Sequence, residues 1–93
     1  MPVVDFTLRW PDGVQQRCSS PSTVIHEHLS PGQTFTVPEL VARSRAAMDA
    51  ASERVRERYG FACTGAAEQQ AAIEQAAARY RDHTGPVTVV EVG

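Results

Sequence analysis

A chain of 93 residues with 42% hydrophobic and 22% charged residues fits one globular domain, residues 1–93, and not a disordered segment. A net charge of −2 without a run of like charges offers no basic surface, so we expect no nucleic-acid partner. No apolar run approaches the ~20 residues of a membrane span, and the N-terminus lacks a signal-peptide pattern. We therefore expect a cytoplasmic protein without a membrane partner, in which the two cysteines, Cys18 and Cys63, are reduced.

The first predicted element is a β-hairpin. Apolar and polar residues alternate from Val4 to Trp10, which is typical of a half-buried strand, and Pro11-Asp12-Gly13 is a turn sequence. A three-residue loop places Phe6 opposite Cys18 and Leu8 near Gln16. Cys18 is therefore predicted to face the core together with the aromatic residues.

The segment after the hairpin allows two interpretations. Residues 23–29 can form a short helix capped by Ser22, or an edge strand of β-branched residues. The helical interpretation is favoured, with Pro31-Gly32 ending it.

A long helix is predicted from Val37 to Arg58. Thr36 and Glu39 have the spacing of a capping box, Pro38 is tolerated in the first turn, and Gly60 ends the helix. Its apolar stripe has a period near 3.6 and consists of Val37, Leu40, Val41, Ser44, Met48, Ala51 and Val55.

A second helix is predicted from Thr64 to about Arg81, antiparallel to the first because the linker, residues 61–63, is short. Its inner stripe is Ala66, Ile73, Ala77 and Tyr80. The valine-rich segment Val87–Val92 is predicted to be a strand, and its pairing within the sheet stays open. The predicted class is α+β, with a small sheet of the N-terminal hairpin and C-terminal strand packed by an antiparallel helix pair.

Cys63 is the candidate nucleophile. It directly precedes a predicted helix N-terminus, where the helix dipole lowers the pKa of a thiol. The alternative is a small buried side chain beneath the interhelical turn. Because no other catalytic constellation accompanies it, no further catalytic residue is predicted.

A metal site is not expected. His26 and His28 diverge on a helix, and neither a CxxC nor an HExxH motif is present. The sequence also lacks a P-loop and a dinucleotide fingerprint, so we expect no cofactor.

The arginines of the long helix follow two flanks of its apolar stripe. Arg43, Arg54 and Arg58 lie along one flank, and Arg45 and Arg56 along the other. One interpretation is a guanidinium cluster that binds a carboxylate or phosphate. The other is that the arginine stems cover the rim of a thin core and their heads pair with neighbouring acids.

Four strings along the chain suggest a known family. They are Arg9-Trp10-Pro11-Asp12-Gly13, Cys18 with Ser20-Pro21-Ser22-Thr23, Ala51-Ser52-Glu53-Arg54-Val55-Arg56, and Tyr59-Gly60-Phe61-Ala62-Cys63. With them the chain resembles small bacterial nitrogen starvation response proteins, encoded in gene clusters with a nitrilase, a radical SAM protein, an acetyltransferase-like protein and a flavin-dependent oxidoreductase. The resemblance implies a role during nitrogen starvation and no particular activity, so it assigns no catalytic residue. It draws interest to Cys18, Cys63, Trp10 and Arg54, although Thr64-Gly65 departs from the expected serine and alanine.

These observations support two main hypotheses. The first is a non-catalytic accessory or binding protein of a nitrogen-starvation-response pathway, associated with enzymes of its gene cluster or with a second copy of itself. Trp10, Cys18, Arg54 and Arg58 are its candidate binding residues. The second is a small enzyme or covalent carrier that uses Cys63 on an electrophilic, nitrile-type intermediate. A third is sensing of a small molecule through the arginines.

Overall fold

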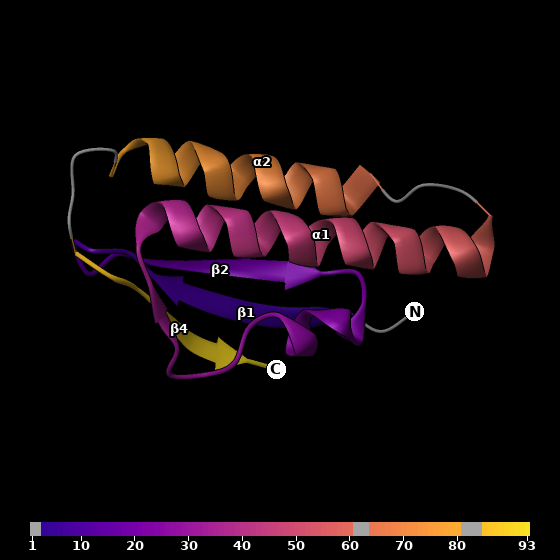
Figure 1. Cartoon of the computed structure of the whole chain (residues 1–93), viewed down its shortest axis with the longest axis horizontal. Helices are drawn as coiled ribbons and strands as arrows, with labels where there is room; N and C mark the ends of the chain where they lie inside the picture. Colours follow the sequence, from indigo (N-terminus) through magenta and orange to yellow (C-terminus); the bar gives the residue numbers. More distant parts are fainter. Residues whose placement is uncertain (1–2, 61–63, 81–84) are drawn as a thin grey trace.

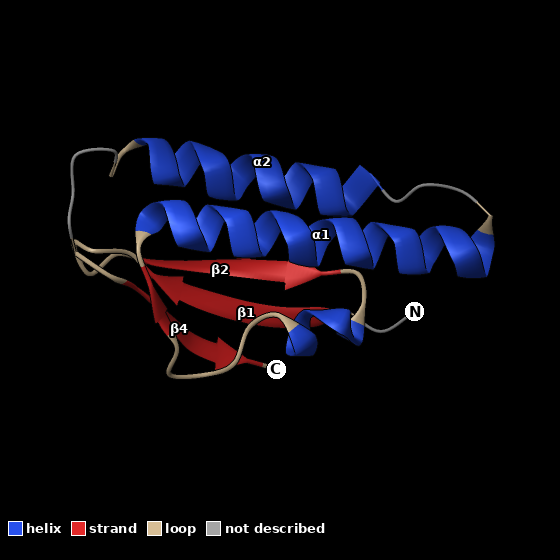
Figure 2. Ribbon diagram, in the orientation of Figure 1, coloured by secondary structure: helices blue, strands red, loops and turns tan. Residues whose placement is uncertain are grey.

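The protein is a four-stranded antiparallel sheet with two long helices packed against it (Figure 1). The structure is a computed structural model that describes residues 3–60, 64–80 and 85–93. Figure 2 shows the two helices lying side by side in one layer and the strands in the other. The strand order is β2-β1-β4-β3, and the predicted α+β class is confirmed.

The hairpin consists of β1 (Val4–Arg9) and β2 (Gln15–Ser20). Gly13 has a φ of 91° and donates its N–H to the carbonyl of Trp10 at 2.8 Å, as expected of the predicted turn. Phe6 pairs with Cys18 and Leu8 with Gln16, so the predicted register is confirmed. This register turns the apolar side chains of β1 towards the helices.

The C-terminal strand β4 (Val87–Val92) pairs with β1 and thereby settles the pairing that the sequence left open. Leu8 is opposite Val89 and Thr7 is opposite Glu91, so Val90 is the extra residue of a β-bulge. On its other side β4 pairs with β3 (Thr34–Phe35). No local pattern predicts β3, because two residues are too few to show a period.

Residues after the hairpin form the short 3₁₀ helix η1 (Thr23–Glu27). Ser22 caps it by accepting the N–H of Val24 at 3.3 Å. Val24 and Ile25 point into the core, so the helical interpretation is confirmed and the strand is excluded. The helix ends at Glu27, before Pro31. The N–H groups of His28 and Leu29, which follow it, both donate to the carbonyl of Ile25.

Helix α1 (Val37–Tyr59) begins with the predicted capping box. The Thr36 hydroxyl accepts the Glu39 N–H at 3.2 Å, and the Glu39 carboxylate accepts the Thr36 N–H at 3.2 Å. Gly60 ends the helix with a φ of 77°, in the left-handed region. The buried stripe is the predicted one, with Ala47 in addition and Val41 only partly buried.

Helix α2 (Thr64–Ala78) runs antiparallel to α1 (Figure 1). It ends earlier than predicted, at Ala78, because Arg79 and Tyr80 tighten into a turn and donate to the carbonyls of Ala76 and Ala77. The predicted linker, residues 61–63, and the predicted last residue of this helix lie outside the described residues. Neither this helix nor any other described helix is long and apolar enough to cross a membrane.

Candidate functional site

The structure describes one of the two cysteines, Cys18, which is buried. Cys63 lies outside the described residues, so its predicted place before the N-terminus of the second helix stays a prediction. Cys18 is only 2% exposed, and its Sγ lies 3.8 Å from the carbonyl oxygen of Gln16. Burial raises the pKa of the Cys18 thiol to about 12, so this group is protonated at neutral pH. Cys18 acts as a small apolar core residue, with no access to a ligand in solution.

Trp10 belongs to a buried cluster that joins the hairpin to the end of α2. Its ring stacks on Tyr80 with centroids 5.2 Å apart and an angle of 5° between the planes. The Trp10 Nε1–H donates to Gln16 Oε1 at 2.9 Å, and the Tyr80 hydroxyl donates to Asp12 Oδ1 at 2.9 Å. Desolvation, with a contribution from Asp12, raises the pKa of Tyr80. Trp10 is 2% exposed, so its ring and its N–H group contact other residues of the protein and not the solvent.

Arg54 and Arg58 are brought together at the surface. They are one helical turn apart near the end of α1, where they line a shallow pocket of about 80 Å³ with Pro21, Ser22, Thr23, Val55 and Tyr59. In the part of the chain that the structure describes, ion pairs join only Arg17 to Asp5 and Arg45 to Glu74. Neither Arg54 nor Arg58 is therefore neutralised by a described carboxylate.

The remaining arginines do not join this pair. Arg43 lies over the ring of Phe35, with its guanidinium carbon 5.5 Å from the ring centroid. Arg45 pairs with Glu74 at 2.8 Å. The cluster interpretation does not extend to Arg43, because eleven helical steps separate the Cα atoms of Arg43 and Arg54 by roughly 16 Å.

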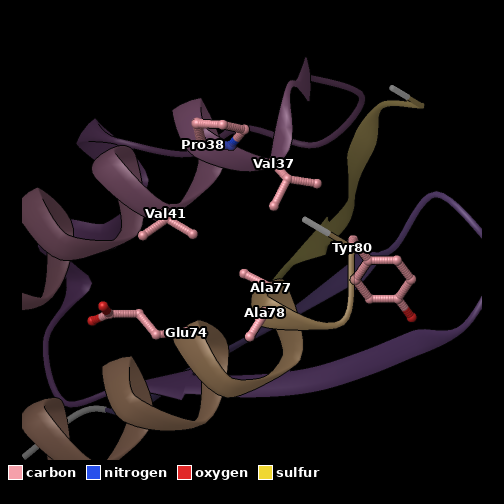
Figure 3. A pocket seen from close by; sticks show the side chains of 7 residues that line it. All are labelled: Val37, Pro38, Val41, Glu74, Ala77, Ala78 and Tyr80. Atoms are coloured by element: carbon pink, nitrogen blue, oxygen red, sulfur yellow. The ribbon is translucent and has the colours of Figure 1, made fainter. Parts of the chain in front are cut away.

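An apolar groove of about 480 Å³ lies at the opposite end of the helix pair. In Figure 3, Val37 and Val41 of α1 face Ala77 and Ala78 of α2 across it, with Glu74 at one end and Tyr80 at the other. The Glu74 carboxylate is occupied, since it accepts from Arg45 at 2.8 Å and from Gln70 Nε2 at 3.1 Å. The groove offers apolar contact area and no unpaired charge among the described residues.

The histidines do not assemble with other ligands. His26 lies exposed on η1, and His28 is partly buried just after it. Within the ranges 3–60, 64–80 and 85–93, no three side chains of His, Cys, Asp or Glu are close enough to hold a metal ion.

The fold defines a small α+β domain, a four-stranded antiparallel sheet with two helices packed against it. A family model described as nitrogen starvation-induced protein NitG matches residues 5–92, so the chain belongs to this family. No curated protein and no solved structure matches the chain. The family membership agrees with the resemblance carried by the four strings, and the gene-cluster setting stays a prediction.

Proposed function

We propose that this chain is a non-catalytic accessory protein of the nitrogen starvation response, which binds an anionic group of a ligand or partner through Arg54 and Arg58. The observation that carries the proposal is the pairing of these two exposed arginines at one pocket without a described carboxylate partner. A guanidinium presents its N–H groups in a planar fork that matches a carboxylate or a phosphate.

The size of the pocket restricts the ligand. A space of about 80 Å³ can receive one carboxylate or phosphate group, and a whole nucleotide cofactor is too large for it. Two like charges at positions i and i+4 also repel each other by a few tenths of a kcal/mol, and a bound anion removes this repulsion. The pocket is therefore suited to the charged end of a metabolite or of a partner's side chain.

Calorimetric titration with inorganic phosphate and with glutarate tests the anion site. We expect saturable binding to the native protein, and binding at least about tenfold weaker to the double variant R54Q/R58Q. R56Q is the matched control, since Arg56 is also exposed on the same helix and does not line the pocket. Equal binding by the native protein and the double variant would contradict the proposal.

The accessory role requires a partner, and the enzymes of the predicted gene cluster are the proposed ones. Co-purification of the tagged protein with the nitrilase, the radical SAM protein and the flavin-dependent oxidoreductase tests this directly. Recovery of at least one enzyme by the native protein, reduced for R54Q/R58Q, supports the role. Recovery of none of them, from a protein that is also monomeric by light scattering, contradicts it.

Thiol labelling distinguishes the accessory role from the alternative, an enzyme or carrier with a reactive Cys63. Because Cys18 is buried with a raised pKa, iodoacetamide labelling of the native protein reports on Cys63 alone. The accessory role predicts slow labelling whose pH dependence follows the ordinary pKa of an exposed thiol. Fast labelling below pH 7, unchanged in C18A, would favour the enzyme or carrier instead.

A further inference from the structure

Strand β2 has a free hydrogen-bonding edge in the described structure, since it pairs with β1 alone. Residues of an antiparallel strand alternate between those that bond to the neighbouring strand and those whose N–H and C=O groups point away from it. The N–H of Ser19 points away from β1, because it donates to the Gln69 side chain of α2 at 3.1 Å. By the same alternation, the backbone groups of Gln15 and Arg17 also point towards the free edge.

A groove of about 420 Å³ lies along this edge, between β2 and the second half of α2. Small side chains leave it open on the helix side, where Ala72 and Ala76 stand, and the stacked Trp10–Tyr80 pair closes one end. Further along β2, outside the groove, the Gln69 amide oxygen accepts the outward N–H of Ser19, as a carbonyl of an added strand would.

We propose that this groove binds an extended, acidic segment of a partner protein, which adds to β2 as a further strand. The free backbone groups of Gln15 and Arg17 pair with the backbone of the segment, at the ~4.8 Å spacing of neighbouring strands. Side chains of the segment that point towards α2 rest on Ala72 and Ala76.

The charge of the groove selects an acidic segment over a second copy of this chain. The described lining includes Arg17 and Arg79 and no carboxylate. The ion pair of Arg17 with Asp5, 3.3 Å long and exposed, is weak and leaves Arg17 available to the segment. Pairing of β2 with the β2 of a second copy would offer Arg17 no acidic cross-strand partner, because Gln15–Ser20 contains no acid.

The groove is separate from the Arg54–Arg58 pocket. It lies beside the hairpin turn and the end of α2, whereas that pocket lies at the end of α1, at the opposite end of the helix pair (Figure 1). The inference goes beyond the proposed function and holds whether or not the pocket binds an anion.

Selection from a displayed library of random peptides of about twelve residues, with the full chain as target, tests the proposal. We expect enriched peptides that combine β-branched and acidic residues, and a synthetic representative should slow the hydrogen exchange of the Gln15 and Arg17 amides. In the variant A72W the indole fills the groove, so peptide affinity should fall at least about tenfold. A71W is the matched control and should bind within about twofold of the native protein, because Ala71 is an exposed neighbour that faces the groove between α1 and α2.

A second pair of variants tests the backbone pairing itself. R17P removes one outward N–H without touching the bonds to β1, whereas R17A removes the same side chain and keeps the N–H. R17P should bind the peptide more weakly than R17A. The proposal is overturned if no peptide is enriched, if A72W binds as tightly as A71W, or if R17P and R17A bind equally. It is also overturned if the two amides are protected in the protein alone, increasingly with protein concentration, since a second copy then occupies the edge.

Discussion

The two ends of the helix pair differ in how their polar groups are satisfied. At the end beside the hairpin turn, Trp10, Tyr80, Asp12 and Gln16 pair with one another through stacking and hydrogen bonds. At the other end, the exposed charges of Arg54 and Arg58 meet no described carboxylate.

This difference separates structural residues from candidate binding residues. A polar group that is buried and paired stabilises the fold, and its removal leaves a partner unsatisfied. An exposed, unpaired cation contributes little to stability and is free to meet an anion from outside. The buried, paired residues of the turn end are therefore expected to respond to mutation through stability, and Arg54 and Arg58 through binding.

The largest effect is expected at the turn end, from Trp10→Ala. The substitution removes a buried ring, its stacking on Tyr80 and the donor to Gln16, so the free energy of unfolding should fall by about 3–5 kcal/mol. Urea denaturation measures it. W10F keeps a ring and loses the N–H, so its loss should be clearly smaller; equal losses would show that the hydrogen bond, and not the packing, holds this end.

The buried thiol gives the second effect, as a dependence on pH. The pKa of Cys18 is about 12 in the folded protein against 9.0 for a free thiol, so the unfolded chain releases the proton first. The contribution of this thiol to the free energy of unfolding should therefore be fully present below pH 9. Above pH 9 it should decline, by up to about 1.4 kcal/mol per pH unit. Urea denaturation from pH 8.5 to 10.5 should show this decline and a shallower one in C18A. The same slope in both proteins would contradict it.

A smaller effect is expected from the cap of α1. Thr36→Ala removes the acceptor for the Glu39 N–H, which should cost about 1 kcal/mol. T34A is a suitable control, because Thr34 is an exposed residue of β3 outside the capping box. Thermal unfolding of the two variants should rank T36A below T34A, and the reverse order would show that the capping box adds little.

The smallest effect on stability is expected at the arginine end. R54Q/R58Q removes two exposed charges that form no described ion pair, so the free energy of unfolding should change by less than about 0.5 kcal/mol. A large loss in urea denaturation would mean that the two side chains hold η1 against α1, and the contrast between the ends would fail.

Local patterns in the sequence predict most of the fold. The alternation through β1, the turn at Pro11-Asp12-Gly13, the capping box and Gly60 each act over a few residues, so each can be read from the chain. The stack of Trp10 on Tyr80 joins residues 70 positions apart, and no local pattern predicts it. The same holds for β3, whose two residues become a strand only because β4 is beside them.

The candidate site was predictable only in part. Helical spacing correctly places Arg54 and Arg58 together, and the length of α1 explains why Arg43 does not join them. The contribution of Pro21, Ser22 and Thr23 to the pocket depends on the packing of η1 against α1, which involves residues about 30 positions apart in the sequence.

Titration of the native protein with inorganic phosphate, followed through the guanidinium N–H signals in NMR spectra, tests the central claim most directly. The account predicts saturable shifts of the Arg54 and Arg58 signals at phosphate concentrations that leave Arg56 and Arg45 unchanged. Shifts of equal size at all four arginines, or shifts that never saturate, would show that these residues are ordinary surface charges and would contradict the account.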